Sequence, residues 1–129
     1  MDAIPPGSWL GLLGGGQLGR MFCMAAQSLG YKVCVLDPGR DSPAGAVADD
    51  HIAADYLDEA ALIELGRRCR AATTEFENVP AAALEFLARH ADMRVLCIID
   101  REDIVAAAKF LLCRADAVAL YERDLMETF

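Results

Sequence analysis

The sequence has few of the features that mark a metal-binding, membrane or nucleic-acid-binding protein. Its 129 residues include five cysteines and two histidines, with no Cys-x-x-Cys pair, so a structural zinc site is not expected. No apolar run is long enough to span a bilayer, and the first residues lack the basic and apolar segments of a secretory signal. The net charge of −8 argues against nucleic acid or an anionic membrane as the main partner.

All five cysteines lie in apolar segments, and their number is odd. This pattern is typical of buried free thiols in a reducing compartment rather than of a disulfide framework. Hydrophobic residues make up 55% of the chain, which is enough for one domain over residues 1–129 with a core of its own. We therefore expect a cytoplasmic, single-domain protein with unpaired thiols at Cys23, Cys34, Cys69, Cys97 and Cys113.

Short apolar segments alternate with segments in which apolar residues recur at helical spacing. The predicted strands are 9–13, 32–36, 51–54, 71–74 and 94–99, with a further short one at 117–121. The predicted helices are 17–29, 59–69, 80–90 and 100–114, and Asp58 is placed to cap the second. Because the strands are continuously apolar, helices should cover both faces of a mainly parallel sheet. The sequence thus predicts an α/β, Rossmann-like, three-layer domain with a sheet of about five strands.

A glycine-rich segment, LLGGGQLGR, joins the first predicted strand to the first predicted helix. The spacing Gly14-x-Gly16-x-x-Gly19 brings backbone N–H groups and a helix N-terminus close to one point, which favours a phosphate. Tight packing of the strand against the helix is the structural alternative, because this spacing alone is a weak signal.

Acidic residues follow two other strands, at the edge where such sheets bind their ligands. Asp37, in an Asp-Pro-Gly segment, either ends its strand with a turn or accepts the ribose 2′-hydroxyl of a dinucleotide. Glu75 and Glu77 occupy alternate positions, so one of these two carboxylates should face the ligand edge. A carboxylate beside a buried strand is costly unless it is paired or solvated, and a solvated loop is the alternative for this segment.

Several motifs occur in order along the chain: GGGQLGRM, then VLDP, DSPAG and VAD, then TTEFENVP. Together they resemble the N-terminal domain of the 5-(carboxyamino)imidazole ribonucleotide synthetase family, over residues 9–90. These ATP-grasp ligases of purine biosynthesis carboxylate aminoimidazole ribonucleotide with bicarbonate, converting ATP to ADP and phosphate. The resemblance implies a pre-ATP-grasp domain that helps to hold the ribonucleotide rather than NAD.

The resemblance also implies which residues contact the substrate. In a related ATP-grasp transformylase the equivalent turn and first glutamate do so, and the corresponding residues here are Gly15, Gly16, Gln17, Leu18 and Glu75. Arg101 is assigned to ATP by resemblance alone, with a solvated residue in the first turn of a helix as the alternative. The same resemblance makes a cofactor ribose a poorer explanation of Asp37.

The resemblance has limits. Enzymes of this family are much longer, and their ATP-binding lysines, magnesium ligands and catalytic body have no counterpart in this sequence, where the match decays after His90. We therefore expect a chain that is inactive alone, from a homodimeric parent that uses ATP, magnesium and bicarbonate. Two alternatives stay open: an NAD-type dinucleotide-binding module, and a non-catalytic fragment that dimerises through exposed apolar surface.

Overall fold

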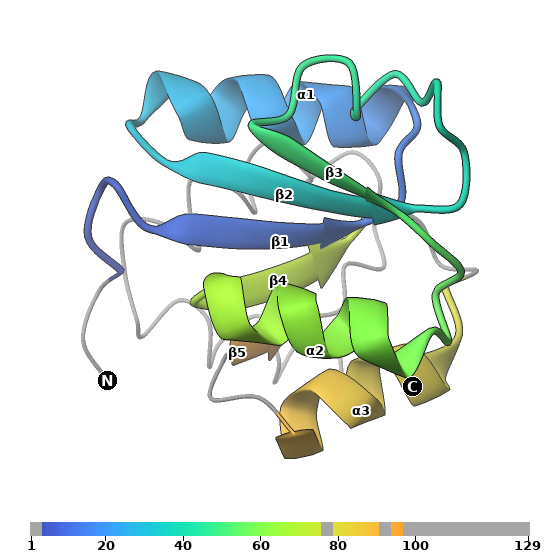
Figure 1. Ribbon diagram of the computed structural model, residues 1–129. Helices are drawn as coiled ribbons and strands as arrows, with labels where there is room; N and C mark the ends of the chain where they lie inside the picture. Colours follow the sequence, from blue (N-terminus) through green and yellow to red (C-terminus); the bar gives the residue numbers. More distant parts are fainter. Residues whose placement is uncertain (1–3, 76–78, 91–93, 97–129) are drawn as a thin grey trace, which may run out of the picture.

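The computed structural model describes residues 4–75, 79–90 and 94–96 as a parallel β-sheet with helices on both faces (Figure 1). The sheet has five strands in the order β3-β2-β1-β4-β5, and every adjacent pair is parallel. The strands are β1 (Trp9–Leu13), β2 (Lys32–Asp37), β3 (Asp50–Ala53), β4 (Ala71–Thr74) and β5 (Arg94–Leu96). The α/β class and the parallel sheet predicted from the sequence are confirmed.

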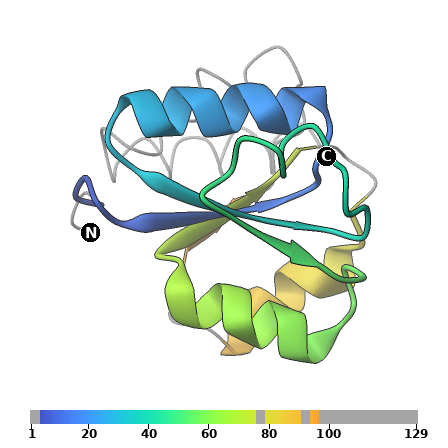
Figure 2. The same cartoon turned by 45° about the horizontal axis from the view of Figure 1, so that its top comes forward.

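Three helices complete the layers in the described part of the chain. They are α1 (Gln17–Ser28), α2 (Glu59–Arg68) and α3 (Ala81–His90). Seen from a second direction, α1 covers one face of the sheet, whereas α2 and α3 cover the other (Figure 2). The helix and strand predicted at 100–114 and 117–121 lie outside the described residues. In the described part of the chain, no helix is long and apolar enough to cross a membrane.

Each face of the sheet has its own apolar core, because side chains alternate between the faces along every strand. On the α1 face, Leu12 and Val35 of the sheet pack with Phe22 of the helix. On the other face, Leu13 and Leu36 pack with Leu65 of α2. All six side chains are almost completely buried, as expected for a sheet covered on both sides.

Local sequence signals set the ends of two helices. The Asp58 side chain accepts a hydrogen bond from the Ala61 amide at 3.1 Å and so caps α2 as predicted. At the end of α1, Gly30 adopts a φ of 91°, which is typical of a glycine that closes a helix. The Gly30 N–H donates to the Gln27 carbonyl at 3.0 Å.

The strand order creates a switch point between β1 and β4. From β1 the chain builds outward to β2 and β3, and then crosses to β4 on the other side of β1. Connections leave the carboxyl ends of β1 and β4 towards opposite faces, and in such folds ligands bind where the connections diverge in this way. The glycine turn follows β1 and Glu75 follows β4, so both lie at this point.

Candidate functional site

Two carboxylates meet the glycine turn after β1. The Gly15 N–H donates to Asp37 Oδ2 at 2.8 Å, and the Gly16 N–H donates to Glu75 Oε2 at 2.6 Å. Asp37 ends β2 and Glu75 follows β4, the two strands that flank β1. Consecutive amides of one turn are therefore bonded to carboxylates that come from opposite sides of the central strand.

The Asp37 carboxylate is fully engaged within the protein. Its Oδ2 accepts the Gly15 N–H and also the Tyr56 hydroxyl at 2.9 Å, while Oδ1 accepts the Gly39 N–H at 2.8 Å. The Nε2 atom of His51 lies 3.3 Å from the Asp37 backbone carbonyl oxygen. Asp37 thus connects the glycine turn, its own turn and the segment before α2. The hypothesis that this carboxylate accepts the ribose hydroxyl of a dinucleotide is not favoured.

Glu75 is a buried carboxylate with capacity left for a ligand. The residue is only 8% exposed, and its backbone N–H continues the sheet by donating to the Leu13 carbonyl at 2.9 Å. Among the described residues it forms no ion pair, and its Oε1 has no hydrogen-bond partner. The positive N-terminus of α1, which starts at Gln17, compensates part of its charge.

The carboxylates explain why glycine is required in the turn. A Cβ on Gly16 would collide with Glu75 Oε1, although the backbone φ of −76° suits any residue. A Cβ on Gly15 would lie 2.6 Å from Ser42 Cβ and 2.9 Å from Asp37 Cγ. The glycines therefore allow side chains to reach the turn closely, a reason distinct from the strand–helix packing considered above.

The loop between β2 and β3 closes over the turn. The Ala44 N–H donates to the Gly15 carbonyl at 2.8 Å, and the Ser42 hydroxyl accepts the Gly45 N–H at 3.0 Å. Ala44 is completely buried against the α1 core. This loop was not predicted to take part in the site. Its DSPAG motif is the signal, because small and turn-forming residues permit such close packing.

Two buried hydroxyls precede Glu75. The Oγ1 atoms of Thr73 and Thr74 have no hydrogen-bond partner among the described residues, and each side chain is about 1% exposed. Buried polar groups are ordinarily hydrogen-bonded, so exceptions of this kind need an explanation. The carboxyl end of β4 is therefore more polar than packing alone requires.

Electrostatics at the site are dominated by negative charge. Burial raises the pKa of Tyr56, and the hydrogen bond to Asp37 and the charges of Asp37 and Glu75 raise it further. The Tyr56 hydroxyl therefore stays protonated and acts as a donor at neutral pH. No group of three or more His, Cys, Asp or Glu residues that could hold a metal ion is found in residues 4–75, 79–90 and 94–96.

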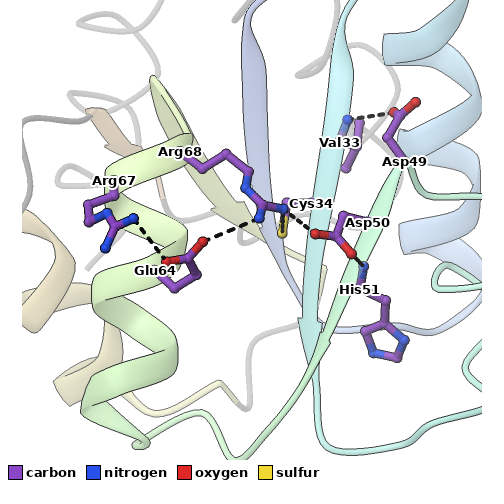
Figure 3. Close-up of polar contacts among 8 residues, drawn as sticks. All are labelled: Val33, Cys34, Asp49, Asp50, His51, Glu64, Arg67 and Arg68. Atoms are coloured by element: carbon purple, nitrogen blue, oxygen red, sulfur yellow. Dashed lines mark hydrogen bonds and ion pairs between the residues drawn. The ribbon is translucent and has the colours of Figure 1, made fainter.

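The amino ends of the strands carry a different polar cluster (Figure 3). Arg68, the last residue of α2, forms ion pairs with Asp50 and with Glu64, the latter at 3.2 Å. Its Nη1 lies 3.8 Å from Cys34 Sγ. A hydrogen bond from Cys69 lowers the pKa of Cys34, and the Arg68 charge adds to this. This cluster lies away from the glycine turn and holds α2 against β2 and β3.

The cysteine prediction is confirmed where the structure describes it. Cys23, Cys34 and Cys69 are free and buried. Burial raises the pKa of Cys23 to about 12, so this thiol is protonated at neutral pH. Cys97 and Cys113 lie outside the described residues.

Comparison with known proteins agrees with this geometry. The family model of the ribonucleotide synthetase preATP-grasp domain matches residues 8–106. The chain belongs to this family. The preATP-grasp domain shares 51% identity over 81 residues with the N5-carboxyaminoimidazole ribonucleotide synthase of Staphylococcus aureus strain MRSA252, which is 63% of this chain and 22% of that protein. The Bacillus subtilis synthase is 48% identical over 88 residues, or 68% of this chain and 23% of that protein.

Solved structures give the same result. The S. aureus synthetase complexed with ADP superposes with a TM-score of 0.67 at 43% identity, covering 74% of this chain and 25% of that one. The Aspergillus clavatus synthase, complexed with ADP and 5-aminoimidazole ribonucleotide, gives 0.61 at 31% identity, over 81% and 26%. The chain thus spans about a quarter of the length of these relatives.

The structure brings most of the predicted site residues together. Gly15 and Gly16 contact the two carboxylates, and Gln17 and Leu18 begin α1 directly after them. Glu75 reaches this point from β4. Of the other residues considered, Arg101 and Glu77 lie outside the described part of the chain. Two residues of the site, Tyr56 and Ser42, were not predicted: Ser42 lies in the DSPAG motif, whereas Tyr56 comes from a loop without a motif.

Proposed function

We propose that this domain holds the ribonucleotide substrate of an ATP-dependent ligase of purine biosynthesis. The ligase carboxylates aminoimidazole ribonucleotide with bicarbonate. The proposal depends chiefly on Glu75, a buried carboxylate at the switch point of the sheet. One of its oxygens accepts the Gly16 N–H, and the other is available to a ligand. The names of the relatives support the reaction, and the A. clavatus structure contains both ADP and the ribonucleotide.

Each site residue has a physical role in this proposal. Glu75 Oε1 accepts a hydrogen bond from a hydroxyl or amine of the ribonucleotide, since a carboxylate only accepts. Gln17 and Leu18, in the first turn of α1, present backbone N–H groups that have no partner within the helix. The exposed Gln17 side chain adds an amide that can donate to the ligand or accept from it. Gly15 and Gly16 precede them in the turn, and because they lack a Cβ, Asp37 and Glu75 can reach the turn and Glu75 is held beside the ligand.

The remaining chemistry belongs to the larger enzyme. The described residues do not suit ATP and magnesium, because the turn's amides are bonded to carboxylates and no metal-ligating group is present among them. We therefore infer that ATP, magnesium and bicarbonate bind to the rest of a full-length, cytoplasmic, homodimeric parent. Arg101 as an ATP contact stays part of the proposal, on the family resemblance alone. We expect the 129-residue chain to bind the ribonucleotide weakly and not to carboxylate it.

Calorimetric titration of the folded chain with aminoimidazole ribonucleotide tests the proposal. Saturable heat in the millimolar range is expected, and Gln17→Ala and Glu75→Ala should weaken binding without unfolding the domain. Asp41→Asn is the control. Asp41 is exposed in the loop after β2, and its substitution removes one negative charge, as Glu75→Ala does. Unchanged affinity in both site variants would remove the site assignment. No heat with folded protein would remove the function itself.

A further inference from the structure

The amides of the glycine turn are bonded to the protein's own carboxylates. We propose that Asp37 and Glu75 make this turn reject phosphate and accept only a hydrogen-bond-donating group of its ligand. In dinucleotide-binding turns of the same spacing, the amides and the helix N-terminus receive a pyrophosphate. Here the Gly15 and Gly16 amides donate at 2.8 and 2.6 Å to Asp37 and Glu75 instead.

A phosphate oxygen that reached either amide would have to displace a carboxylate or lie beside it. Displacing Asp37 would also break its bonds to Gly39 and Tyr56. Lying beside Glu75 would place two negative charges in contact within a partly buried site, where screening by water is weak. Both routes are unfavourable, and the dipole of α1 is already used by Glu75.

Positive charge that could offset this repulsion is absent from the described contacts. Neither Asp37 nor Glu75 forms an ion pair within residues 4–75, 79–90 and 94–96. The ion pairs that are formed there involve Arg67 and Arg68, at the amino ends of the strands. Within the described residues, a phosphate at the turn would therefore meet two carboxylates that no ion pair neutralises.

The free acceptor at this point defines the group that does fit. Glu75 Oε1 has no partner among the described residues, and it can accept from a hydroxyl or an ammonium but not from an oxygen anion. The ligand thus turns its hydroxyl or amine end, and not its phosphate, towards the Gly15–Gly16 peptide. The identity of the ligand in this orientation rests on the proposed function, whereas the rejection of phosphate is independent of it.

The test is a titration of the ¹⁵N-labelled 129-residue chain with inorganic phosphate at constant ionic strength and pH 7. In the unaltered protein the Gly15 and Gly16 amide signals should show no saturable shift up to about 50 mM phosphate. Glu75→Gln keeps an acceptor for the Gly16 amide but removes the charge. In this variant the Gly16 signal should shift saturably, with an affinity at least about tenfold above the limit set for the unaltered protein.

Asp41→Asn is the matched control, because it removes one exposed negative charge. With this variant, phosphate should not shift the Gly15 and Gly16 amide signals. If the spectrum of Glu75→Gln shows that this variant does not fold, the phosphate titration is made with Glu75→Ala instead. Saturable shifts of Gly15 or Gly16 in the unaltered protein would overturn the proposal. Silence in both folded Glu75 variants would also overturn it, because something other than that carboxylate would then exclude phosphate. A failed titration with aminoimidazole ribonucleotide would remove the proposed function and leave this result standing.

Discussion

Replacing Asp37 with asparagine should destabilise the domain, although the side chain keeps its size and shape. The carboxylate accepts from Gly15 and Tyr56 at Oδ2 and from Gly39 at Oδ1. Asparagine has one acceptor oxygen and one amino donor. If the asparagine oxygen faces Gly15 and Tyr56, its amino group points at the Gly39 N–H, and two donors oppose each other. In the reverse orientation the amino group faces the Gly15 N–H and the Tyr56 hydroxyl instead. At least one hydrogen bond is therefore lost, and the others no longer involve a charged acceptor.

The expected cost follows from these bonds. Losing one hydrogen bond to a charged group costs about 1.5–3 kcal/mol, and the Gly39 bond is exposed, which favours the lower part of this range. We expect Asp37→Asn to lower the free energy of unfolding by about 2 kcal/mol. For a domain of this size, that corresponds to a melting temperature lower by about 10 °C.

Urea unfolding, analysed by linear extrapolation, measures this loss. Tyr56→Phe removes one donor and leaves the carboxylate in place, so the two changes combined should cost less than the sum of their separate effects. Asp41→Asn controls for the loss of charge, because Asp41 is exposed, and it should leave the urea midpoint unchanged. An Asp37→Asn protein with the midpoint of the unaltered domain would refute the reasoning.

Three further predictions concern other parts of the structure. Gly16→Ala should destabilise the domain because its Cβ meets the Glu75 carboxylate, and urea titration should show a much smaller cost in a Glu75→Ala background. The Arg68 hydrogen bond lowers the pKa of Asp50, so Asp50 contributes stability above its unfolded-state pKa and loses it as pH falls through its folded-state pKa. Asp50→Asn should accordingly flatten the acid side of the stability–pH curve, and a curve parallel to that of the unaltered protein would count against this. Because burial raises the pKa of Cys23 to about 12, mass spectrometry should find this thiol unmodified by iodoacetamide at pH 8 until urea unfolds the protein.

The hydrophobic pattern was sufficient to predict the layers of the fold. The bounds of β1 and β4 agree with the predicted 9–13 and 71–74, and every residue of the two strands except the half-buried Trp9 is buried. β3 was predicted one residue late, at 51–54, whereas it spans Asp50–Ala53. Asp50 pairs with Cys34 through the backbone, and Arg68 neutralises its side chain. A polar residue compensated in this way leaves no signal in an apolar pattern.

The site was predictable only in outline. Parallel topology puts the carboxyl ends of β1 and β4 at one edge of the sheet, and the strand order makes the two strands neighbours, so that the glycine turn meets Glu75. The Asp37–Gly39 bond spans two residues and is typical of an Asp-Pro-Gly turn. The bond from Tyr56 to Asp37 joins residues 19 positions apart through a loop, and no local pattern encodes such a contact.

The position of Trp9 has a practical consequence. It is the only tryptophan in the sequence, and the Lys32 ammonium and Arg68 guanidinium lie 5.5 and 5.1 Å from its ring centroid. β1 places this indole about 15 Å from the glycine turn at the other end of the same strand. Its fluorescence is therefore an intrinsic reporter of the amino edge of the sheet, where α2 ends. Unfolding of that edge can be followed optically without a label while the opposite edge is filled with ligand.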